Sequence, residues 1–173
     1  DLYKAGGSQR IFYELRDFLY LDAKSVNGTT LGEEIKNSAK WTQNIITDKS
    51  NPVFNAGSIA VLKGTLAPNS AIIKQSAATE SLLIHEGRAV VFEGLEDLAN
   101  RIDRDDLDVT KDDVLVLKSI GPKGGPGMPE AGLIPIPKKL AKQGVKDMVR
   151  ISDGRMSGTA SGTIILHVTP ESY

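Results

Sequence analysis

Two glycine-rich stretches in the C-terminal third of this chain carry the side chains best suited to chemistry. Residues 121–130 read GPKGGPGMPE and end on the carboxylate of Glu130, and residues 151–163 read ISDGRMSGTASGT around the hydroxyl of Ser157. Glycines at this density let the backbone turn sharply and approach a ligand closely. Each stretch follows an apolar, β-like run, which predicts that both lie at strand ends, where α/β proteins commonly hold their ligands.

Glu130 is the first candidate ligand for a metal ion. The stretch that it closes matches neither the Walker-A pattern nor G-x-G-x-x-G, so a nucleotide site is weakly indicated. A carboxylate at the end of such a loop suits a hard cation such as Mg²⁺, which prefers oxygen ligands. A turn with a solvated glutamate explains the same pattern equally well.

Ser157 is the candidate base or nucleophile. A serine hydroxyl is a weak base, and it needs a neighbouring base, cation or metal ion to activate it. No histidine lies close to it in the sequence, so a serine–histidine triad is not supported. Arg155, two residues earlier, is placed to stabilise an anion. The alternative is a Gly/Ser turn that satisfies its own backbone.

The elements that position these residues can be read from the periodicity of the sequence. Apolar residues at helical spacing predict a helix over 8–21, and the capping-box pair Thr30 and Glu33 predicts a second helix. A polar stretch without periodicity follows. We therefore expect a helical arm and linker over 1–56, and a compact domain over 57–173.

The compact domain is expected to be α/β, because short β-like runs alternate with short helical patterns. Strands are predicted at 58–66, 71–74, 88–92, 114–120, 145–151 and 163–168, and helices at 94–102 and 137–143.

The composition excludes several classes of protein. With 173 residues, 40% of them hydrophobic, and a net charge of −1, the chain is of ordinary globular type with no global attraction to nucleic acid or an anionic membrane. It has no cysteine, which excludes a disulfide scaffold, a thiolate nucleophile and any cysteine-ligated metal site within these residues. No apolar run reaches the length of a membrane span. Bases dominate 118–150 and acids dominate 80–113, which fits either solvated surface or a basic side facing an anionic ligand.

The order of the motifs resembles that of the dihydroxy-acid and sugar-acid dehydratase family. The resemblance covers nearly the whole chain and is carried by segments at 57–68, 87–92, 121–130 and 152–171, and in the arm at 21–22 and 30–34. The runs at 156–160 (MSGTA) and 134–140 (IPIPKKL) are similar to those of pentonate dehydratases, which act on arabinonate or xylonate.

The resemblance implies a fold, a reaction and roles for individual residues. The fold would be a swivelling β/β/α barrel-like domain preceded by the helical arm. The reaction would convert a sugar acid or a 2,3-dihydroxy acid into a 2-keto-3-deoxy or 2-keto acid, with Mg²⁺ and an iron–sulfur cluster, taken as [2Fe–2S], as cofactors. Glu130 would be a Mg²⁺ ligand, Ser157 the base for the C2 proton, and Thr159 and Arg155 contacts for the substrate.

The lack of cysteine departs from the family, whose members carry the cluster in an N-terminal domain. The sequence is therefore expected to be the C-terminal part of a longer, homo-oligomeric enzyme of the cytoplasm, or of an organelle matrix in a eukaryote, and to be inactive without the cluster domain. The alternative is a non-catalytic binding or interaction module that keeps the swivelling fold. The joint presence of Glu130, Ser157 and Thr159 favours the enzyme.

Overall fold

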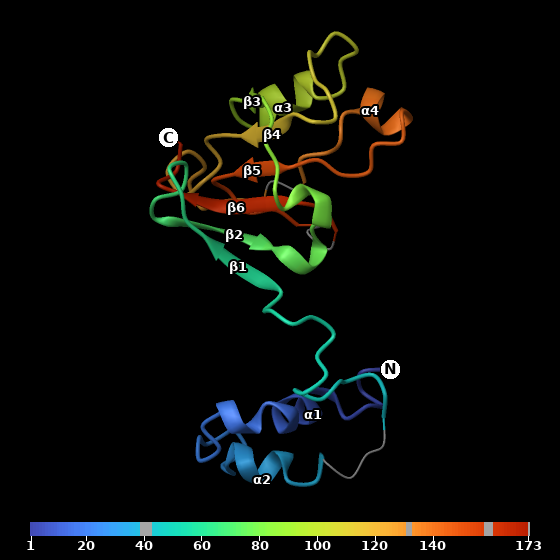
Figure 1. The fold of residues 1–173 in the computed structure, drawn as a ribbon. Helices are drawn as coiled ribbons and strands as arrows, with labels where there is room; N and C mark the ends of the chain where they lie inside the picture. The colour runs from blue at the N-terminus through green and yellow to red at the C-terminus, as the bar shows by residue number, and fades with distance from the viewer. Residues whose placement is uncertain (39–42, 131–132, 158–160, 173) are drawn as a thin grey trace. The chain divides into compact units, whose positions relative to one another are not determined.

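The computed structural model describes residues 1–38, 43–130, 133–157 and 161–172. The chain divides into two compact units, Asp1–Asn55 and Ala56–Tyr173 (Figure 1). Within the described ranges, no helix combines the length and the apolar character that crossing a bilayer requires.

The first unit contains short helices, shorter than the periodicity of the sequence predicts. They are α1 (Gly7–Glu14), a 3₁₀ turn (Arg16–Phe18) and α2 (Leu31–Ile35). The helix expected over 8–21 ends early, where Arg16 donates a side-chain hydrogen bond to the carbonyl of Tyr13 (2.7 Å). The capping box at Thr30 is confirmed, because its hydroxyl accepts from the Glu33 amide while the Glu33 carboxylate accepts from the Thr30 amide.

In the part of the second unit that the structure describes, the strands form one mixed sheet of six. The strands are β1 (Ile59–Leu62), β2 (Ser70–Lys74), β3 (Ala89–Phe92), β4 (Val114–Leu117), β5 (Arg150–Ser152) and β6 (Ile164–Thr169). The helices are α3 (Leu95–Arg101) and α4 (Lys138–Lys142), with 3₁₀ turns at Gln75–Ala77 and Glu80–Leu82. The strands lie side by side in the order β1-β2-β6-β5-β4-β3, which Figure 1 shows.

The direction of the strands decides where the loops gather. β1 pairs with β2, and β2 with β6, in antiparallel fashion, whereas β6, β5, β4 and β3 are mutually parallel. The carboxyl ends of these four parallel strands therefore lie along one edge of the sheet, called the carboxyl edge below. The expected α/β class and the β1–β2 hairpin are confirmed. β1 and β3 are the two edge strands of the described sheet, so the barrel-like and swivelling parts of the expectation stay predictions.

Both faces of the sheet are covered by apolar side chains, but unequally. Ile164 and Leu166 of β6 point into the larger cluster with the helices α3 and α4, whereas Ile165 between them packs with the smaller cluster on the other face. Val168 also belongs to the smaller cluster, although regular alternation would put it with Ile164. His167 explains this, because its left-handed φ of 54° accompanies a shift of register between β2 and β6.

The strand expected over 145–151 is wrong in length, since β5 begins only at Arg150. The residues before it are held by other contacts. Asp147 accepts hydrogen bonds from the Thr163 amide (2.9 Å) and from Arg150 (2.7 Å), and the Met148 side chain is fully buried in the larger cluster. The contacts of Asp147 and the burial of Met148 therefore hold this segment in place, and not the backbone hydrogen bonds of a strand.

Candidate functional site

The two glycine-rich stretches start side by side at the carboxyl edge. Leu117 ends β4 and Ser152 ends β5, and these two residues face each other in the register of the parallel pair. We call residues 118–130 the Glu130 loop, and the described residues 153–157 and 161–163 the Ser157 loop. The tertiary structure thus brings together the beginnings of two loops that are more than thirty residues apart in the sequence.

The predicted functional side chains themselves are exposed. Glu130 is exposed at the end of its loop, and Ser157 follows directly on Met156, whose side chain is only 7% exposed and belongs to the larger apolar cluster. Met156 therefore anchors the Ser157 loop immediately before the hydroxyl that it presents. Thr159 lies outside the described residues.

A direct contact joins the two loops near their functional residues. Arg155 is exposed, and its Nε donates a hydrogen bond to the carbonyl oxygen of Met128 at 2.8 Å. Met128 follows Gly127, and both have left-handed φ angles, 46° and 81°. This turn directs the Met128 carbonyl toward the other loop. The role of Arg155 in substrate binding stays a prediction, and the structure adds that the side chain ties the loops together.

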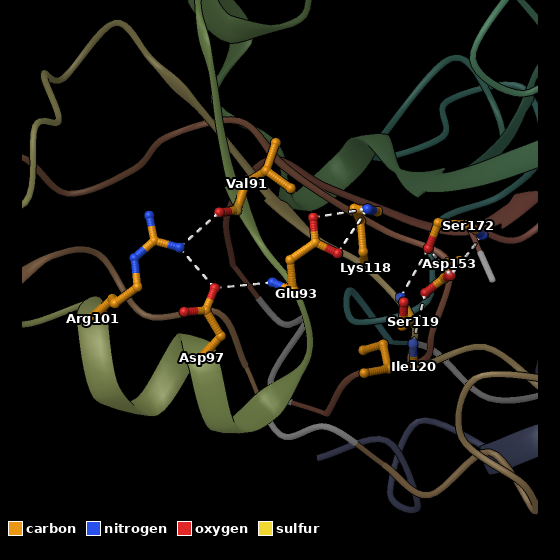
Figure 2. Close-up of polar contacts among 9 residues, drawn as sticks. All are labelled: Val91, Glu93, Asp97, Arg101, Lys118, Ser119, Ile120, Asp153 and Ser172. Carbon is orange, nitrogen blue, oxygen red and sulfur yellow. Dashed lines mark hydrogen bonds and ion pairs between the residues drawn. The ribbon is translucent and has the colours of Figure 1, made fainter.

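A buried carboxylate makes a second connection, which Figure 2 shows. Asp153 begins the Ser157 loop and is only 5% exposed. Its Oδ1 accepts from the Ile120 amide (3.1 Å), and its Oδ2 accepts from the amide (3.0 Å) and hydroxyl (2.6 Å) of Ser172. The Ser172 hydroxyl in turn accepts a hydrogen bond from the Ser119 amide at 2.8 Å. Asp153 and Ser172 therefore connect residues that follow β4, β5 and β6.

Two opposing effects act on the pKa of Asp153. Burial raises the pKa, but hydrogen bonds from Ser172 and from the Ile120 backbone favour the charged form, and together they lower the pKa below its usual range. Asp153 is therefore a carboxylate at neutral pH, and it acts here as an acceptor only.

The connections continue along the edge toward β3. Lys118, directly after β4, forms an ion pair with Glu93, directly after β3, at 2.7 Å. The Glu93 amide donates to Asp97 of α3 at 3.0 Å, and Asp97 pairs with Arg101 at 2.7 Å (Figure 2). The helix α3 is thus linked to the strand end from which the Glu130 loop departs.

Close backbone packing explains two of the glycines. A Cβ at Gly154 would lie 2.5 Å from Cδ1 and Cγ1 of Ile120, and a Cβ at Gly124 would lie 2.5 Å from the carbonyl oxygen of Ser119. Neither position has room for a side chain without movement of its neighbour. The glycines therefore serve the packing of the two loops on each other and on themselves.

An apolar cavity of about 220 Å³ adjoins this network. Its wall includes Leu66, Val116, Ile151 and Val168, and its polar rim includes Asp153 and Ser172. Among the described residues, no group of three or more His, Cys, Asp or Glu side chains is placed to hold a metal ion.

Sequence reasoning did not single out Asp153 or Ser172. Asp153 had a usable signal, because an aspartate followed by glycine directly after an apolar run marks a strand end. Ser172 had none, since nothing in the last residues indicates which loop they contact.

Comparison with known proteins identifies the family. Residues 44–173 match the family model described as dihydroxy-acid/6-phosphogluconate dehydratase C-terminal. A protein from Rhizobium meliloti named as a dehydratase is 51% identical, and an L-arabinonate dehydratase from Rhizobium leguminosarum is 44% identical, each over 99% of this chain and 30% of the relative. A dihydroxy-acid dehydratase from Halothermothrix orenii is 40% identical over 99% of this chain and 31% of the relative.

This chain thus spans about 30% of the length of the relatives that it matches. The match runs through both glycine-rich loops and the sheet that carries them, and it falls on the C-terminal model of the family. The chain belongs to the dihydroxy-acid/6-phosphogluconate dehydratase family.

Proposed function

We propose that this chain is the C-terminal part of a dehydratase that converts a sugar acid or a 2,3-dihydroxy acid into a 2-keto-3-deoxy or 2-keto acid. Ser157 is the base for the C2 proton and Glu130 is one ligand of Mg²⁺. The observation that carries the proposal is the hydrogen bond between Arg155 and Met128, which joins the two loops two residues before each functional side chain. The relatives described above are named as dehydratases, which supports the reaction class.

Glu130 fits the part of a single Mg²⁺ ligand. Mg²⁺ is usually held by one or two carboxylates together with waters and substrate oxygens, so one exposed carboxylate is an adequate contribution from one chain segment. The described residues offer no group of three ligands, so the remaining ones belong to the substrate or to another part of the enzyme. A bound Mg²⁺ supplies positive charge beside the substrate, which lowers the pKa of a nearby hydroxyl.

An iron–sulfur cluster does not fit the residues of this chain. Such clusters are held by cysteine thiolates, and the sequence has no cysteine. We infer that the cluster is bound by a domain corresponding to the part of the relatives that this chain does not match.

The residues of this chain act on the C2 side of the substrate. Ser157 Oγ acts as the base in its deprotonated, alkoxide form, which a nearby Mg²⁺ would favour. It takes the C2 proton, the electrons of the C–H bond form the C2–C3 double bond, and the C3–O bond breaks as the hydroxyl takes a proton from solvent and leaves as water. The enol then gains a proton at C3 and loses the proton of its C2 hydroxyl, which gives the 2-keto acid. Met156 holds the loop so that Ser157 stays in reach, and Arg155 and Thr159 contact the substrate, with Arg155 offering charge to its carboxylate.

We also propose that Ala56–Tyr173 is the swivelling domain of the intact enzyme. Two observations support this: the unit is compact by itself, and its two glycine-rich loops start side by side at one edge of the sheet. An edge of this kind suits a domain that closes over substrate bound elsewhere.

The deciding experiment compares two serines of the same loop in the holoenzyme. Ser157→Ala should lower kcat for 2-keto acid formation by about 10²–10⁴-fold, the usual loss on removal of a general base. Ser161→Ala changes another exposed serine of the loop and should leave kcat close to wild type. Iron content and melting temperature should be unchanged in both. Near-normal turnover of Ser157→Ala with a full cluster would show that the base lies elsewhere.

A further inference from the structure

We infer that Asp153 and Ser172 form a clamp that positions the Ser157 loop against the Glu130 loop, so that the C-terminal tail, residues 170–172, sets the geometry of the proposed proton transfer. The inference rests on the proposed function of Ser157. Neither residue carries a proposed chemical step. Both are positioning residues that act through the loops.

The Ser172 hydroxyl is the centre of the clamp. It donates to Asp153 Oδ2 at 2.6 Å and accepts from the Ser119 amide at 2.8 Å, so one side chain contacts the first residues of both loops. These contacts are with the first residue of the Ser157 loop and the second residue of the Glu130 loop. A hydroxyl can fill both roles at once because it has one donor and two acceptor sites. Removing it breaks the bridge at both ends.

The buried carboxylate makes the bridge stiff. Asp153 is 5% exposed and receives three hydrogen bonds, each to a charged acceptor, and such bonds are worth more than those between neutral groups. Leaving a buried carboxylate without donors is costly, so the Asp153 side chain resists movement of any partner. The Ser157 loop therefore starts from a fixed point.

The neighbouring residue of the tail holds the Glu130 loop at a second place. Glu171 Oε2 accepts a hydrogen bond from the Lys123 amide at 2.6 Å. A Cβ at Gly121 would lie 2.7 Å from the same oxygen, so the tail packs directly on this turn. Two consecutive tail residues thus hold two successive turns of one loop.

Residues with a strained, left-handed backbone conformation also gather at the carboxyl edge. Among the described residues, non-glycine left-handed φ angles occur in segments that meet at the carboxyl edge: Ser70, Ser119, Met128 and His167. Such conformations cost energy and persist where surrounding contacts over-determine them. Ser119 donates to Ser172, Met128 accepts from Arg155, and the His167 amide donates to the Gly154 carbonyl at 3.2 Å. Three of these four positions, all but Ser70, are therefore held by the clamp or by contacts beside it.

The first test measures local motion in the holoenzyme by hydrogen exchange. Ser172→Ala should speed amide exchange about tenfold in peptides from both loops, 119–128 and 153–157, because loss of the bridge lowers the local opening free energy. Ser172→Thr keeps the hydroxyl and should retain wild-type exchange. Thr169→Val is the matched control, since it removes a hydroxyl of the preceding strand end that, among the described residues, bonds its own segment at the His167 carbonyl.

The second test asks whether the clamp acts through Ser157. Ser172→Ala should lower kcat about tenfold with little change in KM, because a small misplacement of the base raises the barrier without removing a substrate contact. In a Ser157→Ala background the same change should cost almost nothing further, since a positioning residue has no effect once the positioned group is gone. Asp153→Asn should behave as Ser172→Ala does.

The outcomes separate this inference from the proposed function. Unchanged exchange in both loops, or faster exchange over the whole chain together with a lower melting temperature, would overturn the clamp. Full additivity of Ser172→Ala and Ser157→Ala would also overturn it. If Ser157→Ala is itself active, the proposed function fails, whereas the exchange experiment still decides whether the tail holds the loops.

Discussion

The guanidinium Nε of Arg155 lies 2.8 Å from the carbonyl oxygen of Met128. Each partner stands two residues before a proposed functional side chain, Ser157 in one loop and Glu130 in the other. The contact is therefore positioned to transmit a displacement of either loop to the other. Arg155 therefore has two properties that mutation can separate: its positive charge, and the Nε–H group that donates to Met128.

The first prediction separates these two properties in the holoenzyme. Arg155→Lys keeps the charge and removes the Nε donor, so KM should change less than about threefold while exchange of 121–128 increases. Arg155→Ala removes both, and KM should rise about tenfold from the loss of one charged contact to substrate. Steady-state kinetics and hydrogen exchange measure the two effects. Equal KM values for the two variants would exclude a charge contact with the substrate.

The second prediction concerns Glu130. Glu130→Gln removes the negative charge of a proposed Mg²⁺ ligand, so half-maximal activity should require about 10–100-fold more Mg²⁺, and excess Mg²⁺ should partly restore turnover. Glu86→Gln, another exposed glutamate, is the control and should keep the wild-type Mg²⁺ dependence. A Mg²⁺ titration of initial rates decides the point. An unchanged titration curve for Glu130→Gln would remove this residue from the metal site.

The third prediction tests the close approach of Gly154 to Ile120. A methyl group at Gly154 would overlap two side-chain carbons of Ile120 at 2.5 Å, so Gly154→Ala should destabilise the fold by about 1–3 kcal/mol, as overpacking does. Ile120→Val shortens the opposing side chain. The double variant should therefore lose less than the sum of the two single changes, as measured by urea unfolding. Simple additivity would mean that the backbone moves instead.

The fourth prediction concerns a buried ion pair at the amino-terminal end of β5, away from the carboxyl edge. Arg150 and Asp147 have side chains 4% and 10% exposed and lie 2.7 Å apart, and Asp147 also accepts from Thr79 and Thr163. Asp147→Asn leaves the Arg150 charge buried without its partner, so it should cost about 3–5 kcal/mol of unfolding free energy. Asp106→Asn breaks an exposed pair with Arg104 and should have a much smaller effect. Urea unfolding at neutral pH compares the two, and a small loss for Asp147→Asn would contradict the prediction.

The fifth prediction is the pH dependence of that pair. Burial raises the pKa of Asp147, but hydrogen bonds from Thr79 and Thr163 and the charge of Arg150 outweigh it, so the pKa is lower than in the unfolded chain. A lowered folded-state pKa gives stability that is present above the unfolded value of about 3.9 and is lost as the pH falls toward the folded value. The stability difference between wild type and Asp147→Asn should therefore shrink below about pH 4. A constant difference between pH 6 and pH 3 would argue against an ionised Asp147.

Local signals in the sequence were sufficient for several elements. The capping box predicted the start of α2, the proline and glycine around 137–144 predicted α4, and two apolar runs around a turn predicted the β1–β2 hairpin. These succeed because their contacts are made between residues close in the chain. The strand over 145–151 was predicted too long, because the segment before Arg150 is held by the distant Thr163 and by burial of Met148.

The sequence by itself indicated which loops carry the proposed functional side chains, since glycine density and residue type are local properties, and its motif order indicated the family. Only the tertiary structure decided what holds these loops together. Asp153, Ser119 and Ser172 are widely separated in the chain, and they meet because parallel pairing aligns the carboxyl ends of β4, β5 and β6. A hydrogen bond between such residues depends on strand order and register, which no local pattern encodes.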